Sequence, residues 1–189
     1  TAQAIGAIYS FSNGTKQSAG CMGTIGTTSF FPSKNLGCYG DGGAIFCNND
    51  ALAQKIRMIA NHGQSVQYTH EIIGVNSRLD TIQAAILNVK LPFLNEYNNK
   101  RRAIAKKYDE AFANIDAITI PEIGKNRSHV YHQYTLKING NFRDQLKAYL
   151  AEQGIPSMVY YPKPLHFQKA FNTAIFNAED LKLTELLCT

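Results

Sequence analysis

The sequence predicts an α/β protein in two parts, a larger α/β part followed by a smaller α+β part. In the first part, short runs of β-branched and aromatic residues alternate with amphipathic helical patterns. A long amphipathic helix then leads into a second, shorter series of strand and helix patterns. We therefore expect residues 1–90 to form one part, and residues 91–189 to form a bridging helix and the second part.

Three apolar runs rich in Ile, Thr and Phe predict the strands of the first part. They cover residues 4–11, 24–30 and 44–47. Asn49 or Asp50 then caps a helix that runs to about residue 61, and Gly63 ends it. We expect a polar loop over residues 64–75.

A capping-box pattern predicts the start of the next helix. Ser77 stands three residues before Asp80, ahead of an apolar stripe that runs from Leu79 to Val89. Pro92 interrupts this helix, and a long amphipathic helix then extends to about Asn114. Its length suits a bridge between the two parts.

The sequence pattern of the second part predicts alternating strands and helices. They are a strand at 130–138, a helix at 142–153, a strand at 155–161 and a helix at 179–188. Asn141 is the expected cap of the first of these helices, and Gly154 its stop. The strand pattern places His129 and His132 on opposite faces, which argues against a shared metal site.

Composition and charge exclude several classes of function. The net charge is +5, and the basic residues are scattered except at 100–102 and 106–107, where a solvated helix face explains them better than a nucleic-acid footprint. No apolar run is long enough to cross a bilayer. The four cysteines lack metal or disulfide spacing, which favours a cytoplasmic protein. We expect no nucleic-acid, membrane or metal partner.

The most informative segment runs from Ser29 to Gly43. It places Lys34 in a loop rich in proline and glycine, which fix the backbone and allow a ligand to approach it closely. A lysine amine held unprotonated near a carbonyl can form a Schiff base. Taken by itself, the segment also allows a solvated lysine in a surface loop.

Longer motifs accompany this segment. They are Ala2-Gln3-Ala4-Ile5-Gly6-Ala7, Ser29-Phe30-Phe31-Pro32-Ser33-Lys34-Asn35-Leu36-Gly37, Gly40-Asp41-Gly42-Gly43-Ala44, Asn61-His62-Gly63, Gly74-Val75-Asn76-Ser77-Arg78-Leu79-Asp80, Gln83-Ala84-Ala85, His129-Val130-Tyr131-His132-Gln133-Tyr134 and Tyr161-Pro162-Lys163-Pro164-Leu165-His166. With them, essentially the whole chain resembles the DegT/DnrJ/EryC1/StrS family of sugar-nucleotide aminotransferases, which use pyridoxal 5'-phosphate (PLP).

The resemblance implies a fold and a cofactor site. The fold is that of PLP-dependent transferases (type I aminotransferases), with residues 1–90 as the C-terminal part of the large domain. Lys34 matches the lysine that holds PLP through a Schiff base and moves the proton during amino transfer. Ser29 matches a hydroxyl that binds the cofactor phosphate, and Gln3 a residue beside the pyridine ring. Asn76 matches an asparagine that reaches the phosphate of a neighbouring subunit.

The same resemblance implies substrates and partners. Arg78, Tyr160, Tyr161 and His166 match positions that contact the nucleotide sugar, and Arg78 does so from the partner of a homodimer with shared active sites. The implied reaction moves an amino group from an amino-acid donor, glutamate, onto a nucleotide-linked keto hexose for amino-sugar and surface-polysaccharide biosynthesis. The motifs are closest to relatives that act on UDP-linked 3-keto sugars. A non-catalytic PLP-binding regulator, or a PLP-dependent sugar dehydratase, is the alternative.

Each site residue also has a structural interpretation. Ser29 could be an ordinary strand hydroxyl, Asn76 a turn residue, and His166 part of a packed wall. Arg78 could pair with Glu71 or Asp80 on the surface.

The family's aspartate for the pyridine nitrogen falls ahead of Thr1. We therefore expect residues 1–189 to be part of a longer protein, inactive and poorly soluble when isolated, with a parallel sheet that lacks several strands.

Overall fold

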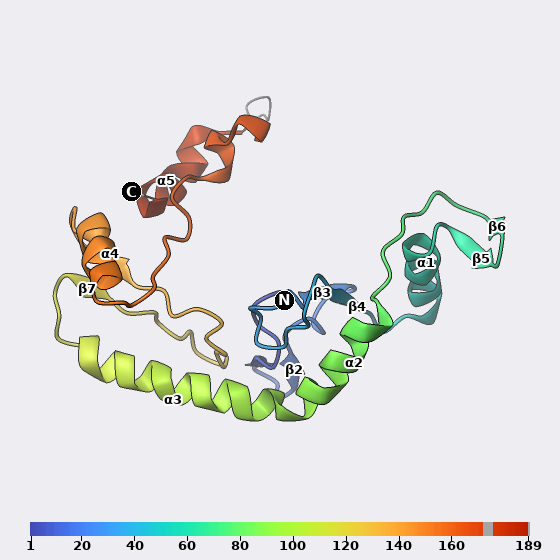
Figure 1. Cartoon of the computed structure of the whole chain (residues 1–189), viewed down its shortest axis with the longest axis horizontal. Helices are drawn as coiled ribbons and strands as arrows, with labels where there is room; N and C mark the ends of the chain where they lie inside the picture. The colour runs from blue at the N-terminus through green and yellow to red at the C-terminus, as the bar shows by residue number, and fades with distance from the viewer. Residues whose placement is uncertain (172–175, 189) are drawn as a thin grey trace. The chain divides into compact units, whose positions relative to one another are not determined.

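The computed structural model describes residues 1–171 and 176–188 (Figure 1). The chain divides into two compact units. The first comprises Thr1–Tyr108 with Glu122–Tyr134, and the second comprises Asp109–Pro121 with Thr135–Thr189. Among the described helices, none is both long enough and apolar enough to cross a membrane.

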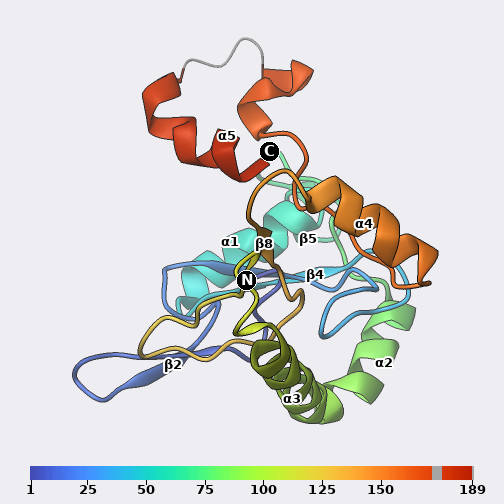
Figure 2. The ribbon, with the colours of Figure 1, turned by 90° about the vertical axis from the view of Figure 1, so that its left-hand side faces the viewer.

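Two antiparallel strand pairs open the first unit. β1 (Ile8–Ser10) pairs with β2 (Lys16–Ser18), and β3 (Gly26–Ser29) pairs with β4 (Gly43–Phe46) (Figure 2). The three predicted strands are therefore present: β1 and β3 are shorter than their apolar runs, and β4 begins one residue earlier than predicted. β2 was not predicted because its three residues, Lys-Gln-Ser, are all polar and exposed. Every strand pair in the described residues is antiparallel, so the expected parallel pairing is not found there.

Helix α1 (Asp50–Ala60) follows β4 with the predicted cap. The Leu52 N–H donates to Asn49 Oδ1 at 2.8 Å, which satisfies one of the free amides of the first turn. The helix ends at Ala60, and Gly63 follows in the left-handed region at φ 74°. The predicted polar loop contains a short hairpin, β5 (Gln64–Val66) with β6 (Thr69–His70), that lies beside α1 (Figure 1).

Two helices follow in succession, and the second of them extends from the first unit into the second. α2 (Thr81–Lys90) leads through a 3-10 turn, η1 (Leu91–Phe93), into α3 (Leu94–Phe112), so the chain changes helix at Pro92 as predicted (Figure 1). The predicted capping box at Ser77 is wrong. Asp80 is the N-cap and makes no side-chain cap bond, because residues 77–80 stay extended and the Ser77 N–H bonds to the Ala60 carbonyl at 2.9 Å.

The core of the first unit lies between the β3–β4 pair and these two helices. Its buried members are Phe30, Leu36, Cys38, Leu87 and Leu94, with Ile5 and Ala44 packed against them. Three of the five belong to the segment that joins β3 to β4. This loop is therefore an interior element of the unit.

The second unit consists of a short strand pair and several helical segments. In order they are β7 (Ile118–Thr119), β8 (Lys137–Ile138), α4 (Arg143–Glu152), η2 (Leu165–Phe167), η3 (Lys169–Phe171), η4 (Ala178–Leu181) and α5 (Lys182–Cys188). The predicted final helix is thus a 3-10 turn followed by α5. Gly154 ends α4 as predicted, at φ 73°.

The predicted strand at 130–138 is wrong except for its last two residues, which form β8. Tyr131 adopts φ 44°, a left-handed conformation that a bulky residue takes only when its surroundings impose it. This turn ends the extended run, so strand alternation does not describe His129 and His132. Among the described residues, no cluster of metal-binding side chains is found.

Two further predictions in the second unit are wrong. Residues 155–161 form no strand, because no neighbouring strand pairs with them and their apolar side chains stay exposed. Asn141 does not cap α4; the N-cap is Phe142, which has a helical backbone and makes no side-chain cap bond.

Candidate functional site

Ser29 and Lys34 lie on one continuous turn at the carboxyl end of β3. The Phe31 N–H donates to Ser29 Oγ at 3.2 Å, and the Lys34 N–H donates to the Phe31 carbonyl at 2.8 Å. Both predicted residues are partly buried. The structure therefore brings a hydroxyl and an amine, the two groups predicted from the motif, onto the same short segment.

The base of this turn is locked into the core. The Cys38 N–H donates to the Phe30 carbonyl at 2.8 Å, and this bond closes the loop that carries Lys34. Leu36 is 4% exposed and Cys38 is fully buried. Burial of apolar side chains on both sides of the closing bond fixes the loop, because any shift would expose them to water.

Gly37 allows a close backbone contact within the loop. A Cβ at this position would lie 2.5 Å from the Pro32 carbonyl oxygen, a distance at which Cβ atoms are essentially never found from another heavy atom. The Lys90 ammonium, from the end of α2, donates to the Gly37 carbonyl at 2.6 Å and lies 4.5 Å from the centre of the Tyr39 ring. Gly37 thus permits the close turn within the loop, and Lys90 at the end of α2 hydrogen-bonds to that turn.

Two buried asparagines tie the same loop to the rest of the unit. Asn35 Nδ2 donates to Asn98 Oδ1 at 2.7 Å and to the Val130 carbonyl at 2.9 Å. Asn98 Nδ2 donates in turn to the Ile5 carbonyl at 3.1 Å. A buried amide is costly unless it is hydrogen-bonded, so these contacts specify how the segments meet.

The sequence analysis missed both asparagines. A signal exists for Asn98, which lies four residues after Leu94 and seven before Ala105, on the face of α3 that those two buried residues define. A polar residue inside an apolar helical stripe indicates a buried hydrogen bond. For Asn35, the only signal is its position next to Lys34.

His132 also lies near Lys34. Burial lowers the pKa of its imidazole below the ordinary value, and the positive charges of Lys34 and Arg101 lower it further. Arg101 donates to the carbonyls of Tyr131 and His132, at 3.0 and 3.2 Å, and so holds this segment against α3. His132 Nδ1 is buried and has no hydrogen-bond partner within the described part of the chain. The lowered pKa favours a neutral imidazole, and its partly exposed ring lies within electrostatic range of the Lys34 amine.

Gln3 lies in an exposed turn at the start of the chain. The Ala4 N–H donates to the Thr1 carbonyl and the Ala7 N–H to the Ala4 carbonyl, both at 2.9 Å. The next residue but one, Ile5, accepts the bond from Asn98. The same asparagine pair therefore links the turn of Gln3 to the loop of Lys34.

Asn76 and Arg78 lie in the exposed, extended segment that precedes α2. Arg78 Nε donates to Asn76 Oδ1 at 3.1 Å, and the Asn76 backbone forms a bridge with Asn61. The arginine bonds to this amide instead of pairing with Glu71 or Asp80. Both predicted residues are exposed, so their polar groups are open to a partner surface.

The remaining predicted residues belong to the second unit. Tyr160 and Tyr161 are exposed and line a hollow of about 580 Å³ together with the Pro162–Leu165 segment and part of α5. His166 does not line it. Its Nε2 lies 2.9 Å from Glu185 Oε1, and its ring packs on Phe167 and Phe176, as the packed-wall interpretation would have it.

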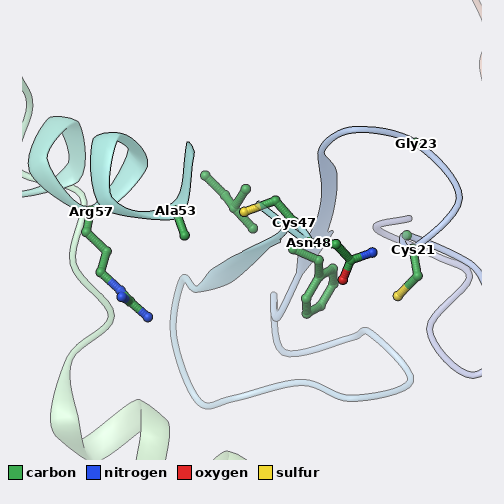
Figure 3. A pocket seen from close by; sticks show the side chains of 9 residues that line it. Cys21, Gly23, Cys47, Asn48, Ala53 and Arg57 are labelled. Atoms are coloured by element: carbon green, nitrogen blue, oxygen red, sulfur yellow. The ribbon is translucent and has the colours of Figure 1, made fainter. Parts of the chain in front are cut away.

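A second hollow, of about 340 Å³, is lined by residues of β4, of α1 and of the loop before β3. Cys47, Asn48 and Phe46 approach it from β4 and the turn after it, Arg57 from α1, and Cys21 from the loop before β3 (Figure 3). None of the predicted site residues lines this hollow.

The family model of the DegT/DnrJ/EryC1/StrS aminotransferases matches residues 1–189. The chain belongs to this family. Its fold is the type I aminotransferase fold that the sequence predicted, and two solved structures support this. A DegT/DnrJ/EryC1/StrS aminotransferase from Brucella abortus superimposes with a TM-score of 0.88 at 42% identity, over 99% of this chain and 48% of that one.

NtdA from Bacillus subtilis, solved with its bound cofactor PMP, superimposes with a TM-score of 0.76 at 32% identity, over 87% of this chain and 39% of that one.

Two curated relatives show the range of the family. A pleiotropic regulatory protein of Geobacillus stearothermophilus is 49% identical, over 90% of this chain and 44% of the relative. The UDP-2-acetamido-2-deoxy-3-oxo-D-glucuronate aminotransferase of Pseudomonas aeruginosa is 47% identical, over 89% of this chain and 45% of that enzyme. The chain thus spans a little under half the length of the relatives that it matches.

Proposed function

We propose that the intact protein is a PLP-dependent aminotransferase that moves an amino group from an amino-acid donor, glutamate, to the keto group of a nucleotide-linked hexose. The observation that carries this proposal is Lys34, partly buried on a loop that hydrogen bonds and core packing hold in one conformation. A lysine carried on a loop whose backbone is fixed in this way is suited to capture a carbonyl.

The residues around Lys34 fit part of a PLP site. Lys34 would hold the cofactor aldehyde, and the Ser29 hydroxyl would bind its phosphate. His132 Nδ1, which is buried and has no hydrogen-bond partner among the described residues, leaves one polar atom near Lys34 for a further hydrogen bond. When bound, PLP supplies a conjugated ring that withdraws electrons from the substrate carbon. Lys34, displaced from the cofactor by the amine of the donor, would have a free amine that could remove and return the proton at that carbon.

The site requires groups that these residues do not supply. We propose that Asn76 and Arg78 act in the active site of a second subunit, where Asn76 binds the cofactor phosphate and Arg78 a charged group of the nucleotide sugar. Their exposure, and the bond that orients Arg78 on Asn76, support this placement. Tyr160 and Tyr161, which line the hollow of the second unit, are the proposed sugar contacts.

The substrate we propose is a UDP-linked 3-keto sugar, the class to which the substrate named for the Pseudomonas relative belongs. The test is a panel of nucleotide-linked keto sugars, incubated with glutamate and the intact protein and analysed by mass spectrometry. We expect Lys34→Ala to abolish formation of the amino sugar. Lys55→Ala, which removes an exposed lysine of α1, should retain wild-type activity.

A regulatory function is the second candidate. It is favoured by the relative named as a pleiotropic regulatory protein, which is 49% identical. The same pair of variants separates the two functions. A regulator would keep its cellular effect in the Lys34→Ala variant and would show no amino transfer in the wild type. Those two results together would overturn the aminotransferase proposal.

A further inference from the structure

A pair of buried amides occupies the point where three segments of the first unit meet. Asn98 is 1% exposed and Asn35 is 7% exposed, and they share a hydrogen bond of 2.7 Å. Asn35 directly follows Lys34 in the chain, whereas Asn98 lies in the second turn of α3. Since α3 is a 19-residue helix, it provides a rigid reference to which the loop can be fixed.

Each amide uses its remaining bonds to reach a different segment. Asn35 Nδ2 also donates to the Val130 carbonyl at 2.9 Å, two residues before His132. Asn98 Nδ2 donates to the Ile5 carbonyl at 3.1 Å, two residues after Gln3. The pair therefore connects the loop of Lys34 with the segments that contain Gln3 and His132.

The packing around Asn98 restricts its position. Gly6 lies directly against the Asn98 amide, at φ 85°, and a Cβ on Gly6 would collide with Asn98 Nδ2. Leu94, one helical turn before Asn98, belongs to the core with Leu36 and Cys38. Asn98 is thus confined on one side by a residue without a side chain and on the other by the core.

We propose that Asn98 is a positioning residue that holds Lys34 at the cofactor by fixing the amide of Asn35. The inference rests on the proposed function, because it assigns Asn98 a part in that site without contact to the reacting atoms. Loss of Asn98 would leave Asn35 with one bond, to Val130, since Asn35 Oδ1 has no partner within the described residues. The loop would then stay folded but would move.

The test compares Asn98→Ala with Asn95→Ala in the intact protein. Asn95 lies on the same helix and is exposed, so the chemical change is matched. A third variant, Asn98→Leu, removes both hydrogen bonds but fills the space with an apolar side chain of similar branched shape, in case the cavity left by alanine prevents folding. Amide hydrogen exchange in the absence of cofactor is measured over residues 30–38 and over α1, and the dissociation constant of PLP is measured by titration.

We expect both Asn98 variants to exchange about ten-fold faster over residues 30–38 and to bind PLP about ten-fold more weakly, with α1 unchanged. The turnover number should fall while the Michaelis constant for the sugar is kept, because the sugar contacts are untouched. Asn95→Ala should match the wild type in each measurement.

Unchanged exchange over residues 30–38 would overturn the inference. A uniform rise in exchange over residues 30–38 and α1 would also overturn it, since Asn98 would then support the fold in general. A wild-type protein that neither binds PLP nor transfers an amino group would instead overturn the proposed function, and the exchange result would still show whether Asn98 fixes the loop.

Discussion

The Lys34 loop and the segment before α2 carry the two proposed halves of a cofactor site, and they are built in opposite ways. Asn35–Cys38 are all buried, and hydrogen bonds from Asn98, Lys90 and the loop itself fix them. In the segment over residues 71–80, every residue from Asn76 onward is exposed and Ile73 is 98% exposed.

This difference indicates what stabilises the conformation of each half. The Lys34 loop is specified by its own unit, because core packing and buried hydrogen bonds leave it one conformation. The segment with Asn76 presents apolar and polar groups together, as surfaces that meet another protein surface do. Its exposed apolar neighbours are Val66, Tyr68, Ile73, Val75 and Ile82.

The largest expected effect tests whether the two halves act in different subunits. Lys34→Ala and Asn76→Ala variants of the intact protein should each be nearly inactive. If they are unfolded and refolded together, half of the random dimers carry one intact site, so activity should recover to about a quarter of the wild-type value. Each variant refolded alone is the control. A mixture that stays inactive would contradict shared sites and would indicate that Asn76 acts in the same subunit as Lys34.

A substitution at Gly37 tests how tightly the Lys34 loop is packed. We expect Gly37→Ala to lower the free energy of unfolding by about 2–4 kcal/mol, because the new methyl group would press on the carbonyl oxygens of Phe31 and Pro32. Gly23→Ala is the control, since its Cβ would meet nothing nearer than 3.7 Å and should change stability by less than about 0.5 kcal/mol. Denaturant unfolding of the intact protein measures both; equal stabilities would show that the loop is not confined.

Truncation of one apolar side chain in each region compares their packing directly. Leu36→Ala should destabilise the unit by about 2–4 kcal/mol, because Leu36 is 4% exposed and its loss leaves a cavity. Ile73→Ala should change the unfolding of a dissociated subunit by less than about 0.5 kcal/mol, since that side chain already faces water. The measurement is denaturant unfolding at low protein concentration. A large loss for Ile73→Ala under those conditions would contradict its exposure within the subunit.

The smallest expected effect is electrostatic. The pKa of His132 is lowered by burial and then by the charges of Lys34 and Arg101, whereas that of His129 is lowered by burial and by Arg127. Removal of the Lys34 charge in Lys34→Ala favours the protonated imidazole, so the pKa of His132 should rise while that of His129 stays constant. NMR titration of the ring protons follows both. A parallel shift of the two would indicate a general change of environment.

The same lowering predicts the direction of a stability change with pH. Both histidines bind protons less readily in the folded state than in the unfolded chain, so stability should fall as the pH drops below the ordinary histidine pKa, near 6.5. The double variant His129→Gln, His132→Gln should lose less stability between pH 7 and 5.5 than the wild type does, as denaturant unfolding at each pH would show.

Local patterns predicted several elements of the structure. Asn49 at the start of α1, Gly154 after α4 and the change of helix at Pro92 were all predicted, because caps and breakers act through bonds within a few residues. The predictions at Ser77 and Asn141 failed for the complementary reason. Tertiary context keeps the chain at these positions in another conformation, so the capping bonds do not form.

The sequence by itself determined the family, and with it the fold and the lysine on which the proposed chemistry depends, because these follow from residue types at fixed spacing. Only the tertiary structure decided what holds that lysine. The bonds from Asn35 and Asn98 join residues that are 63 or more positions apart, and Tyr131 leaves the extended conformation that its neighbours favour. Such contacts depend on where folding brings distant segments together, and no local pattern records them.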